Sequence, residues 1–374
     1  MVDLHKGTIT LPVNMILSNS GQLFFSSNAK AVKKVLDRSG KPKLGISNKS
    51  FNASVVQKLV MNSYIEEIYL REPELLSKRL EIIDTNNLII YALLYRKLSP
   101  ALAEMLSTSS VLMDYNRKNP RNQIHSISQI DLKTVNNLKA QKRSLFEMIE
   151  MEINSEVVQR ILSNRELGEE DRLNRIKSLN KFLQCIDSRI WYLYLIIYQT
   201  SLKENIKNSF SDMIAEYLDR TKISIYMSNL LMELVLNSER NHFERIFASQ
   251  HVKGEQLDLI LCDAENRKWA VEEAVAKKQF LTLSWNISTE ASFKGKNYRL
   301  VINIINNGLN NEAMKMQRPG DYQGDDLLRL TSEIGNMLIT NIEALCKKDK
   351  INFRINFNAD VHLNQTTSTV EFRV

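Results

Sequence analysis

Residues 280–306, FLTLSWNISTEASFKGKNYRLVINIIN, contain two β-rich runs on either side of a polar turn. The runs cover residues 280–288 and 298–306, and the turn between them is TEASFKGKN. Runs of β-branched and aromatic residues that are bounded by such turn residues are typical of an antiparallel hairpin. A second pair of β-rich runs, residues 351–358 and 368–374, closes the chain. We expect these four runs to form strands of one sheet.

Amphipathic helices are predicted on both sides of the first hairpin. Apolar residues recur at helical spacing in residues 231–243, LMELVLNSERNHF, and again from Asp325 to about Lys347. The order helix, hairpin, loop, helix, hairpin predicts an α/β sandwich over residues 210–374. We expect the helices around Met232 and Leu338 to cover one face of its sheet, and the whole chain to be of the α+β class.

The central part of the chain is predicted to be helical. No glycine lies between Gly45 and Gly168 and no proline lies between Pro120 and Pro319, and both residues destabilise helix interiors. Helical apolar spacing appears in several runs, beginning with SVVQKLVMNSYIEEIYL at residues 54–70. We therefore predict a helical bundle over residues 55–205.

The first 50 residues are predicted to form a small α+β segment. TITLPVNMIL and LFFSS are separated by the turn-like SNSGQ, which indicates a strand pair. The run NAKAVKKVLDR at residues 28–38 predicts a short basic helix that ends at SGKPKLG.

Composition indicates a folded protein with 43% hydrophobic and 25% charged residues. No apolar run is long enough to cross a bilayer, so no membrane span is expected. Three scattered cysteines and five scattered histidines favour neither disulfides nor a metal site, and we expect a cytoplasmic protein. The net charge of +7 suits a nucleic-acid-associated scaffold, but it also suits basic residues spread over solvated helix faces. The densest basic stretches lack aromatic residues that could stack on bases.

The helix at residues 231–243 carries a polar column on an apolar background. Glu233, Asn237 and Arg240 are spaced at one helical turn, so one face of the helix presents all three side chains. Taken alone, this pattern favours a solvated or capped polar stripe over a site.

The motif ELVLNSER, in its order with the hairpin and the C-terminal strands, resembles the N-box of the GHKL superfamily of gyrases, heat-shock chaperones, histidine kinases and MutL-type ATPases. The resemblance covers about residues 210–374 and implies a Bergerat-like sandwich with a mixed sheet. It implies that Asn237 is a ligand of Mg²⁺ in Mg·ATP and that Arg240 contacts the phosphates. Glu233 falls where some members place a general base for the hydrolytic water.

The other motifs of that superfamily are altered in this sequence. The stretch IINNGLNN keeps Gly308 but has Asn306 in place of the acid that binds adenine and Asn310 in place of a second glycine. The phosphate turn is reduced to Gly320 and Gly324, and the two acids that follow would repel phosphate. Thr367 or Thr369 lies near the position of the family's closing threonine.

The resemblance implies a regulatory or signalling protein with a degenerate nucleotide-binding fold that acts by binding a ligand or a partner. We expect either a protein partner or a homodimer through the helical region. An active Mg·ATP-dependent ATPase or kinase is the alternative, and the basic scaffold is a third. Histidine autophosphorylation is not expected, because no histidine lies between His125 and His242, and His125 lies in a loop-like stretch.

Overall fold

The computed structural model describes residues 8–9, 13–27, 45–48, 51–198, 203–247, 255–292, 295–307, 333–348, 351–360 and 362–373. The chain divides into two compact units, which differ from the segments 1–50, 55–205 and 210–374 expected from the sequence. Unit 1 combines residues 1–92 with residues 223–374, and unit 2 comprises residues 93–222. The helix α4 (Arg79–Ser107) begins in unit 1 and ends in unit 2.

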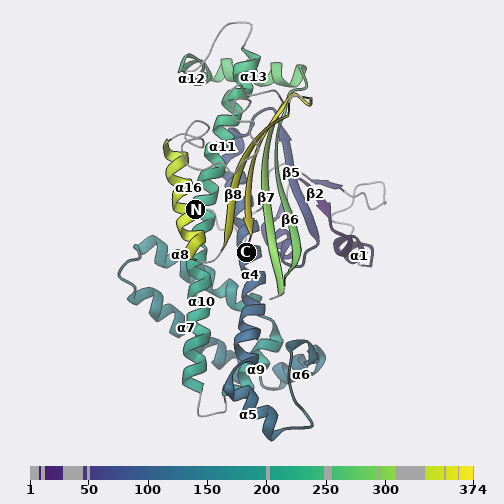
Figure 1. The fold of residues 1–374 in the computed structure, drawn as a ribbon, viewed down its shortest axis with the longest axis vertical. Helices are drawn as coiled ribbons and strands as arrows, with labels where there is room; N and C mark the ends of the chain where they lie inside the picture. Colours follow the sequence, from purple (N-terminus) through teal and green to yellow (C-terminus); the bar gives the residue numbers. More distant parts are fainter. Residues whose placement is uncertain are drawn as a thin grey trace. The chain divides into compact units, whose positions relative to one another are not determined.

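Unit 1 contains an antiparallel sheet with seven described strands in the order β3-β2-β5-β6-β7-β9-β8 (Figure 1). They are β2 (Val13–Leu17), β3 (Gly45–Asn48), β5 (Ile65–Glu72), β6 (Leu281–Ser292), β7 (Gly295–Asn307), β8 (Asn352–Asp360) and β9 (Gln365–Arg373). Two short strands, β1 (Thr8–Ile9) and β4 (Phe51–Asn52), form a separate pair. The two predicted hairpins are thus present as β6–β7 and β8–β9. Every described pair is antiparallel, so the expectation of a mixed sheet is wrong for the described strands.

One face of the sheet is apolar and buried. In β7 the side chains of Tyr298, Leu300, Ile302 and Ile304 are buried, whereas the alternate side chains are partly exposed, as the two-residue period of a strand requires. The helices α11 (Lys222–Ile246) and α16 (Glu333–Lys348) lie on the same side of the sheet in Figure 1. The chain is therefore of the α+β class, as the sequence predicted.

Four shorter helices complete the described part of unit 1. They are α1 (Asn19–Ser27), α3 (Ala53–Met61), α12 (Glu255–Leu261) and α13 (Ala264–Ala276), and a 3-10 turn, η1 (Leu76–Lys78), follows β5. The last turns of α11 pack against α12 and α13 through a buried apolar cluster that includes Phe243, Leu257 and Ala270.

Two predictions for the N-terminal part are wrong. Residues 54–70 do not form one helix, because α3 ends before Ser63, which has a positive φ of 57°, and β5 begins at Ile65. Strand β5 pairs with β2 and β6, and these long-range partners override the helical spacing of its residues. The run LFFSS lies in α1 and not in a strand, because the Ser18 hydroxyl accepts from the amide of Gly21 at 3.0 Å and so starts a helix. The predicted helix at residues 28–38 and residues 325–332 of the later helix lie outside the described residues.

Every described element of unit 2 is helical. After the end of α4 these are α5 (Ser110–Lys118), η2 (Ile127–Gln129), α6 (Leu132–Gln141), α7 (Arg143–Ser163), α8 (Glu169–Cys185), α9 (Ser188–Tyr198) and α10 (Lys203–Arg220). One stripe of α7 is buried at Phe146, Ile149, Ile153, Val157 and Ile161, the spacing of a core-facing helix.

Candidate functional site

A pocket of about 300 Å³ lies in unit 1 beside the C-terminal half of α11. Asn237 and Arg240, the expected metal ligand and phosphate contact, both line it. The remaining lining residues come from α11, from η1, from the end of α12 and the residue after it, and from α13. They are Leu76, Leu236, Glu239, Phe243, Leu261, Cys262 and Arg267. The pocket is thus mostly apolar with a few polar groups, which is the usual make-up of a small-molecule site.

Glu239 fixes the wall of this pocket. Its side chain is 1% exposed, and its Oε2 accepts hydrogen bonds from the backbone amides of Leu75 at 2.6 Å and Leu76 at 2.9 Å. The amides at the start of η1 have no partner within that short turn, so the carboxylate acts as their cap. The bonds connect α11 to the segment after β5, which is more than 160 residues earlier in the chain.

Arg267 on α13 joins the same network. Its guanidinium donates to Glu239 and, through Nε at 2.7 Å, to Glu74, and it lies 5.8 Å from the ring centroid of Phe243. Partial burial works to lower the pKa of Arg267, but the two carboxylates outweigh it and raise that pKa. Arg267 therefore stays charged and holds α13 against α11.

Asn306, the expected adenine contact, lies at the end of β7 and is 4% exposed. Its Nδ2 donates to the carbonyl oxygen of Ser238 at 2.9 Å, and its Oδ1 accepts from the guanidinium of Arg245. Both polar atoms of the Asn306 side chain therefore form hydrogen bonds with residues of α11. Asn306 is absent from the lining of the pocket that contains Asn237.

His242 and Arg245 are two further titratable groups near Asn306. Burial and the charge of Arg245 lower the pKa of His242 to about 4, although Asn306 and the backbone of Pro73 oppose the shift in part. Neither ring nitrogen makes a hydrogen bond of good geometry within the described part of the chain. Burial also lowers the pKa of Arg245 to about 10, with Glu244 opposing. The imidazole is thus neutral at neutral pH, and Arg245 is still a cation.

The structure brings together only part of the predicted site. Asn237 and Arg240 share a pocket, while Glu233, one turn earlier on α11, does not line it. Thr367 lies in β9, where it pairs with Ile305 and Asn358 in the sheet. Gly308, Asn310, Gly320, Gly324 and the acids at 325 and 326 lie outside the described residues.

Sequence reasoning did not identify Glu239, His242, Arg245 or Arg267. Glu239 and His242 had a detectable signal, because they follow Val235 at intervals of four and seven residues, on the buried stripe of α11. For Glu239 the signal indicates a buried network, because a charged residue at a core-facing position is almost never left unpaired. Arg267 has no such signal, since its partner Glu74 is 193 residues away.

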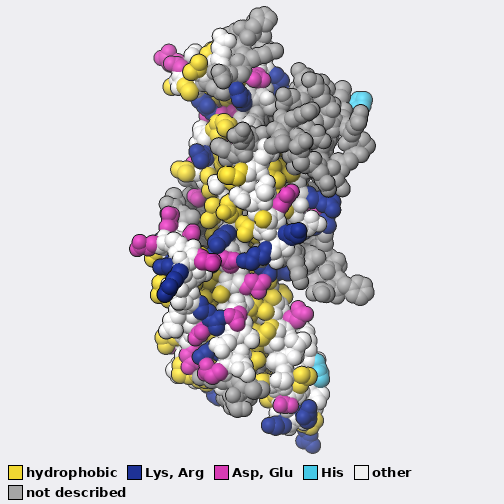
Figure 2. Space-filling model, turned by 60° about the vertical axis from the view of Figure 1, so that its left-hand side comes forward, with side chains coloured by type: hydrophobic (Ala, Val, Ile, Leu, Met, Phe, Trp, Pro, Cys, Tyr) yellow, Lys and Arg dark blue, Asp and Glu magenta, His cyan; other side chains and the backbone are white. Residues whose placement is uncertain are grey.

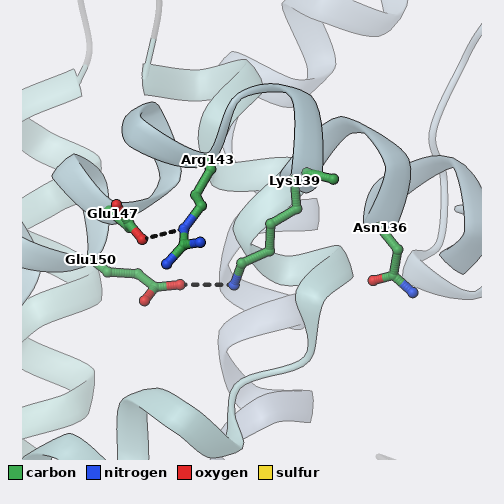
Figure 3. Close-up of a pocket in the computed structure, with 6 residues that line it drawn as sticks. Asn136, Lys139, Arg143, Glu147 and Glu150 are labelled. Carbon is green, nitrogen blue, oxygen red and sulfur yellow. Dashed lines mark hydrogen bonds and ion pairs between the residues drawn. The ribbon is translucent and has the colours of Figure 1, made fainter.

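A second hollow, of about 390 Å³, lies in unit 2 between α6 and the start of α7 (Figure 3). Lys139 and Glu150 face each other across it at 3.0 Å, and Arg143 bonds Glu147 at 2.7 Å on its rim. These side chains are largely solvated, and ion pairs of that kind contribute little to stability. The charges are matched within the hollow, so it offers little attraction to a charged ligand.

Two negative findings apply to the described residues only. No helix among them is long and apolar enough to cross a membrane. The same residues contain no cluster of three or more histidine, cysteine or acidic side chains placed to hold a metal ion.

Comparisons with known proteins identify a family but no activity. A family model described as a family of unknown function, DUF8084, matches residues 4–319. The chain is similar to an "Uncharacterized protein" of Treponema pallidum (strain Nichols), with 22% identity over 389 residues and full coverage of both chains. No solved structure matches the chain significantly.

Proposed function

Because the chain belongs to the DUF8084 family of unknown function, we propose a function from the site itself: a regulatory protein that acts by binding. In this proposal unit 1 is a degenerate nucleotide-binding domain of GHKL type. The pocket beside Asn237 and Arg240 takes a small ligand, and the chain does not hydrolyse ATP. A cytoplasmic location and a protein partner belong to the same proposal.

The engagement of Asn306 is the observation that carries this proposal. A residue that binds adenine must offer its side-chain oxygen to the amino group of the base. Here that oxygen accepts from Arg245, and the side chain is buried against α11. Adenine would have to displace a charge-assisted hydrogen bond, which contributes about 1.5–3 kcal/mol. Binding of ATP in the manner of the GHKL superfamily should therefore be weaker.

The pocket itself supports ligand binding. Its walls are Leu76, Leu236, Phe243 and Leu261, and its polar groups include two guanidiniums and the carboxamide of Asn237. Glu239, the one carboxylate in the lining, is occupied by backbone amides and by Arg267. A ligand with an apolar body and a hydrogen-bond acceptor group fits these walls best.

A thermal-shift panel on the full chain tests the proposal, because a ligand that binds only the native state must raise the melting temperature. The panel contains small carboxylates and phosphate esters with apolar bodies, together with Mg·ATP, Mg·ADP and oligonucleotides. We expect a stabilising compound from the first group, an effect that is lost in Arg240→Ala and kept in the control Arg117→Ala. Arg117 is a solvated arginine of unit 2.

The active Mg·ATP enzyme is the second candidate, and the shared pocket of Asn237 and Arg240 favours it. Calorimetry separates the two. Micromolar binding of Mg·ATP that is lost in Asn237→Ala would overturn the degenerate assignment and favour the enzyme. Stabilisation by oligonucleotides alone would favour the basic scaffold, although Lys, Arg, Asp and Glu side chains are interspersed on the described face in Figure 2.

A further inference from the structure

Helix α7 carries apolar side chains on two nearly opposite faces. One face is the buried stripe from Phe146 to Ile161, and α7 packs within unit 2 against α6, α8, α9 and α10. The other face carries Met148, Met151 and Leu162, which are 39%, 63% and 54% exposed. A helix at the surface of a soluble unit normally presents polar residues on its outer face. The outer face of α7 is therefore suited to contact a partner.

The exposed apolar residues of α7 belong to a narrow seam along the helix. The outer seam consists of residues at alternating intervals of four and three, and they are Ser144, Met148, Met151, Ser155, Val158 and Leu162. An average interval of 3.5 residues is the pattern of a coiled coil, in which one seam packs into the seam of another helix. The spacing thus selects a helix as the occupant of this face.

We propose that the outer seam of α7 packs antiparallel against the outer seam of a second copy of the chain, over the full length of the helix. The seam alternates between two kinds of heptad position. In an antiparallel pair each layer joins one kind to the other, because the direction of one helix is reversed. Full-length overlap gives three layers, each formed twice by the two-fold symmetry. They are Ser144 with Leu162, Met148 with Val158, and Met151 with Ser155.

Side-chain size makes the outer seam complementary to itself in this arrangement. Every layer sets a larger side chain against a smaller one, which is how facing residues interdigitate without voids. A parallel pair would set each residue against its own counterpart. Met151 would then meet Met151, and Ser155 would meet Ser155 and leave a gap.

The charges beside the outer seam also favour the antiparallel pair. Glu147 flanks the seam on one side and Glu152 on the other. In a parallel pair the flanking positions of the two helices face each other, so Glu147 of each copy would face Glu152 of the other. In the antiparallel pair Glu147 lies level with the uncharged C-terminal end of the other helix. Only Glu152 then approaches its own counterpart, and its carboxylate accepts from the hydroxyl of Tyr198 at 2.9 Å within its own unit.

The expected dimer is weak. A helix of 21 residues is about 30 Å long, and one helix per copy makes an interface at the small end of specific interfaces. Association therefore depends on concentration. The dimer makes specific the homodimer through the helical region that the sequence suggested. It uses unit 2 and does not depend on the ligand pocket of unit 1.

Sedimentation velocity of the full chain over a roughly hundredfold concentration range is the first test. We expect a monomer–dimer equilibrium whose dissociation constant rises about tenfold or more in Met151→Glu, because a carboxylate would enter an apolar seam without a partner. Met113→Glu is the matched control, since it makes the same change on α5 at a side chain that is 55% exposed. Circular dichroism checks that both variants keep the fold.

Disulfide trapping tests the direction of the helices. In a Cys262→Ser background, which removes the exposed natural thiol, Met151→Cys and Ser155→Cys are prepared as separate proteins. A disulfide requires Cα atoms within about 7 Å. Residues 151 and 155 share a layer in the antiparallel pair, so an equimolar mixture should cross-link on mild oxidation. Ser155→Cys alone should not, because its two copies are offset by four residues, or about 6 Å along the axis.

These two experiments either establish or overturn the proposal. A monomer at every concentration overturns it, as does a dimer that Met151→Glu weakens no more than Met113→Glu does. Efficient cross-linking of Ser155→Cys with itself also overturns it, because that residue meets itself only in the parallel pair. A dimer that Met151→Glu weakens selectively, and that is trapped in the mixture but not with Ser155→Cys alone, establishes it.

Discussion

Asn306 at the end of β7 donates its side-chain amide to the carbonyl oxygen of Ser238 on α11 at 2.9 Å. Both groups are buried, so this bond attaches the end of a central strand to the helix above it. The same carboxamide accepts from Arg245. Asn306, which the resemblance to the GHKL superfamily places at the adenine, is thus part of the internal packing of unit 1.

Replacing Asn306 by alanine should destabilise the protein. The variant leaves the Ser238 carbonyl and the guanidinium of Arg245 without this partner, and an unsatisfied buried group costs about 1–3 kcal/mol. Urea denaturation measures the change in the free energy of unfolding. Asn307→Ala, at the adjacent exposed position, is the control and should have little effect. Equal effects of the two variants would show that the bonds of Asn306 contribute nothing.

Replacing Glu239 should have a larger effect. Glu239→Ala removes the acceptor of two backbone amides and leaves Arg267 with one carboxylate in place of two. Breaking a buried ion pair from one side costs about 3–5 kcal/mol. Glu239→Gln keeps one acceptor oxygen, so its stability should lie between that of Glu239→Ala and that of the wild type.

The control for Glu239 is Glu272→Ala, which removes an exposed acid of α13. Chemical denaturation of all four proteins orders their stabilities. A Glu239→Ala protein as stable as the Glu272→Ala protein would contradict the role of the carboxylate as a cap and ion-pair partner.

Stability should fall as the pH is lowered from about 6.5 to about 4, in part because of His242. The unfolded imidazole takes up a proton near its ordinary pKa of 6.5, whereas the folded one does so only at about 4. The unfolded state therefore binds more protons within this window, and the loss is on the order of 3 kcal/mol, complete below the folded pKa. Above pH 6.5 both states are neutral and the contribution vanishes.

Comparison with His242→Gln isolates this effect, because other titrating groups contribute equally to both proteins. The free energy of unfolding of the variant should depend less steeply on pH between 6.5 and 4. The exposed His125→Gln serves as the control and should keep the slope of the wild type. An unchanged slope in His242→Gln would mean that His242 does not titrate as described.

A buried polar network should set the position of α4 against α11 and β6. The Ser228 hydroxyl accepts from Asn86 at 2.8 Å and donates to Asn87 at 2.9 Å, while Trp285 Nε1 donates to Asn86 at 3.2 Å. Ser228→Ala leaves the carboxamides of Asn86 and Asn87 without this partner. The change should lower the free energy of unfolding by about 1–3 kcal/mol. Asn229→Ala, one residue later and exposed, is the control. Thermal unfolding of the two variants would refute the prediction if their melting temperatures agreed.

The sequence by itself determined the elements that have strong local signals. The hairpins at 281–307 and 352–373 follow from alternating β-branched residues and polar turns, and α11 follows from its apolar spacing. Their order was sufficient to predict the α+β class and the arrangement of two helices on one side of a sheet.

Only the tertiary structure decided which long-range partners complete these elements. Residues 65–72 have a spacing compatible with a helix, and they form a strand because β2 and β6 offer hydrogen bonds on both sides. The network of Glu239 with Leu75, Leu76 and Arg267 joins three separate parts of the chain. Local patterns carry no information about such partners. A buried polar group needs a hydrogen-bond partner, and the folded chain determines which donors lie within reach.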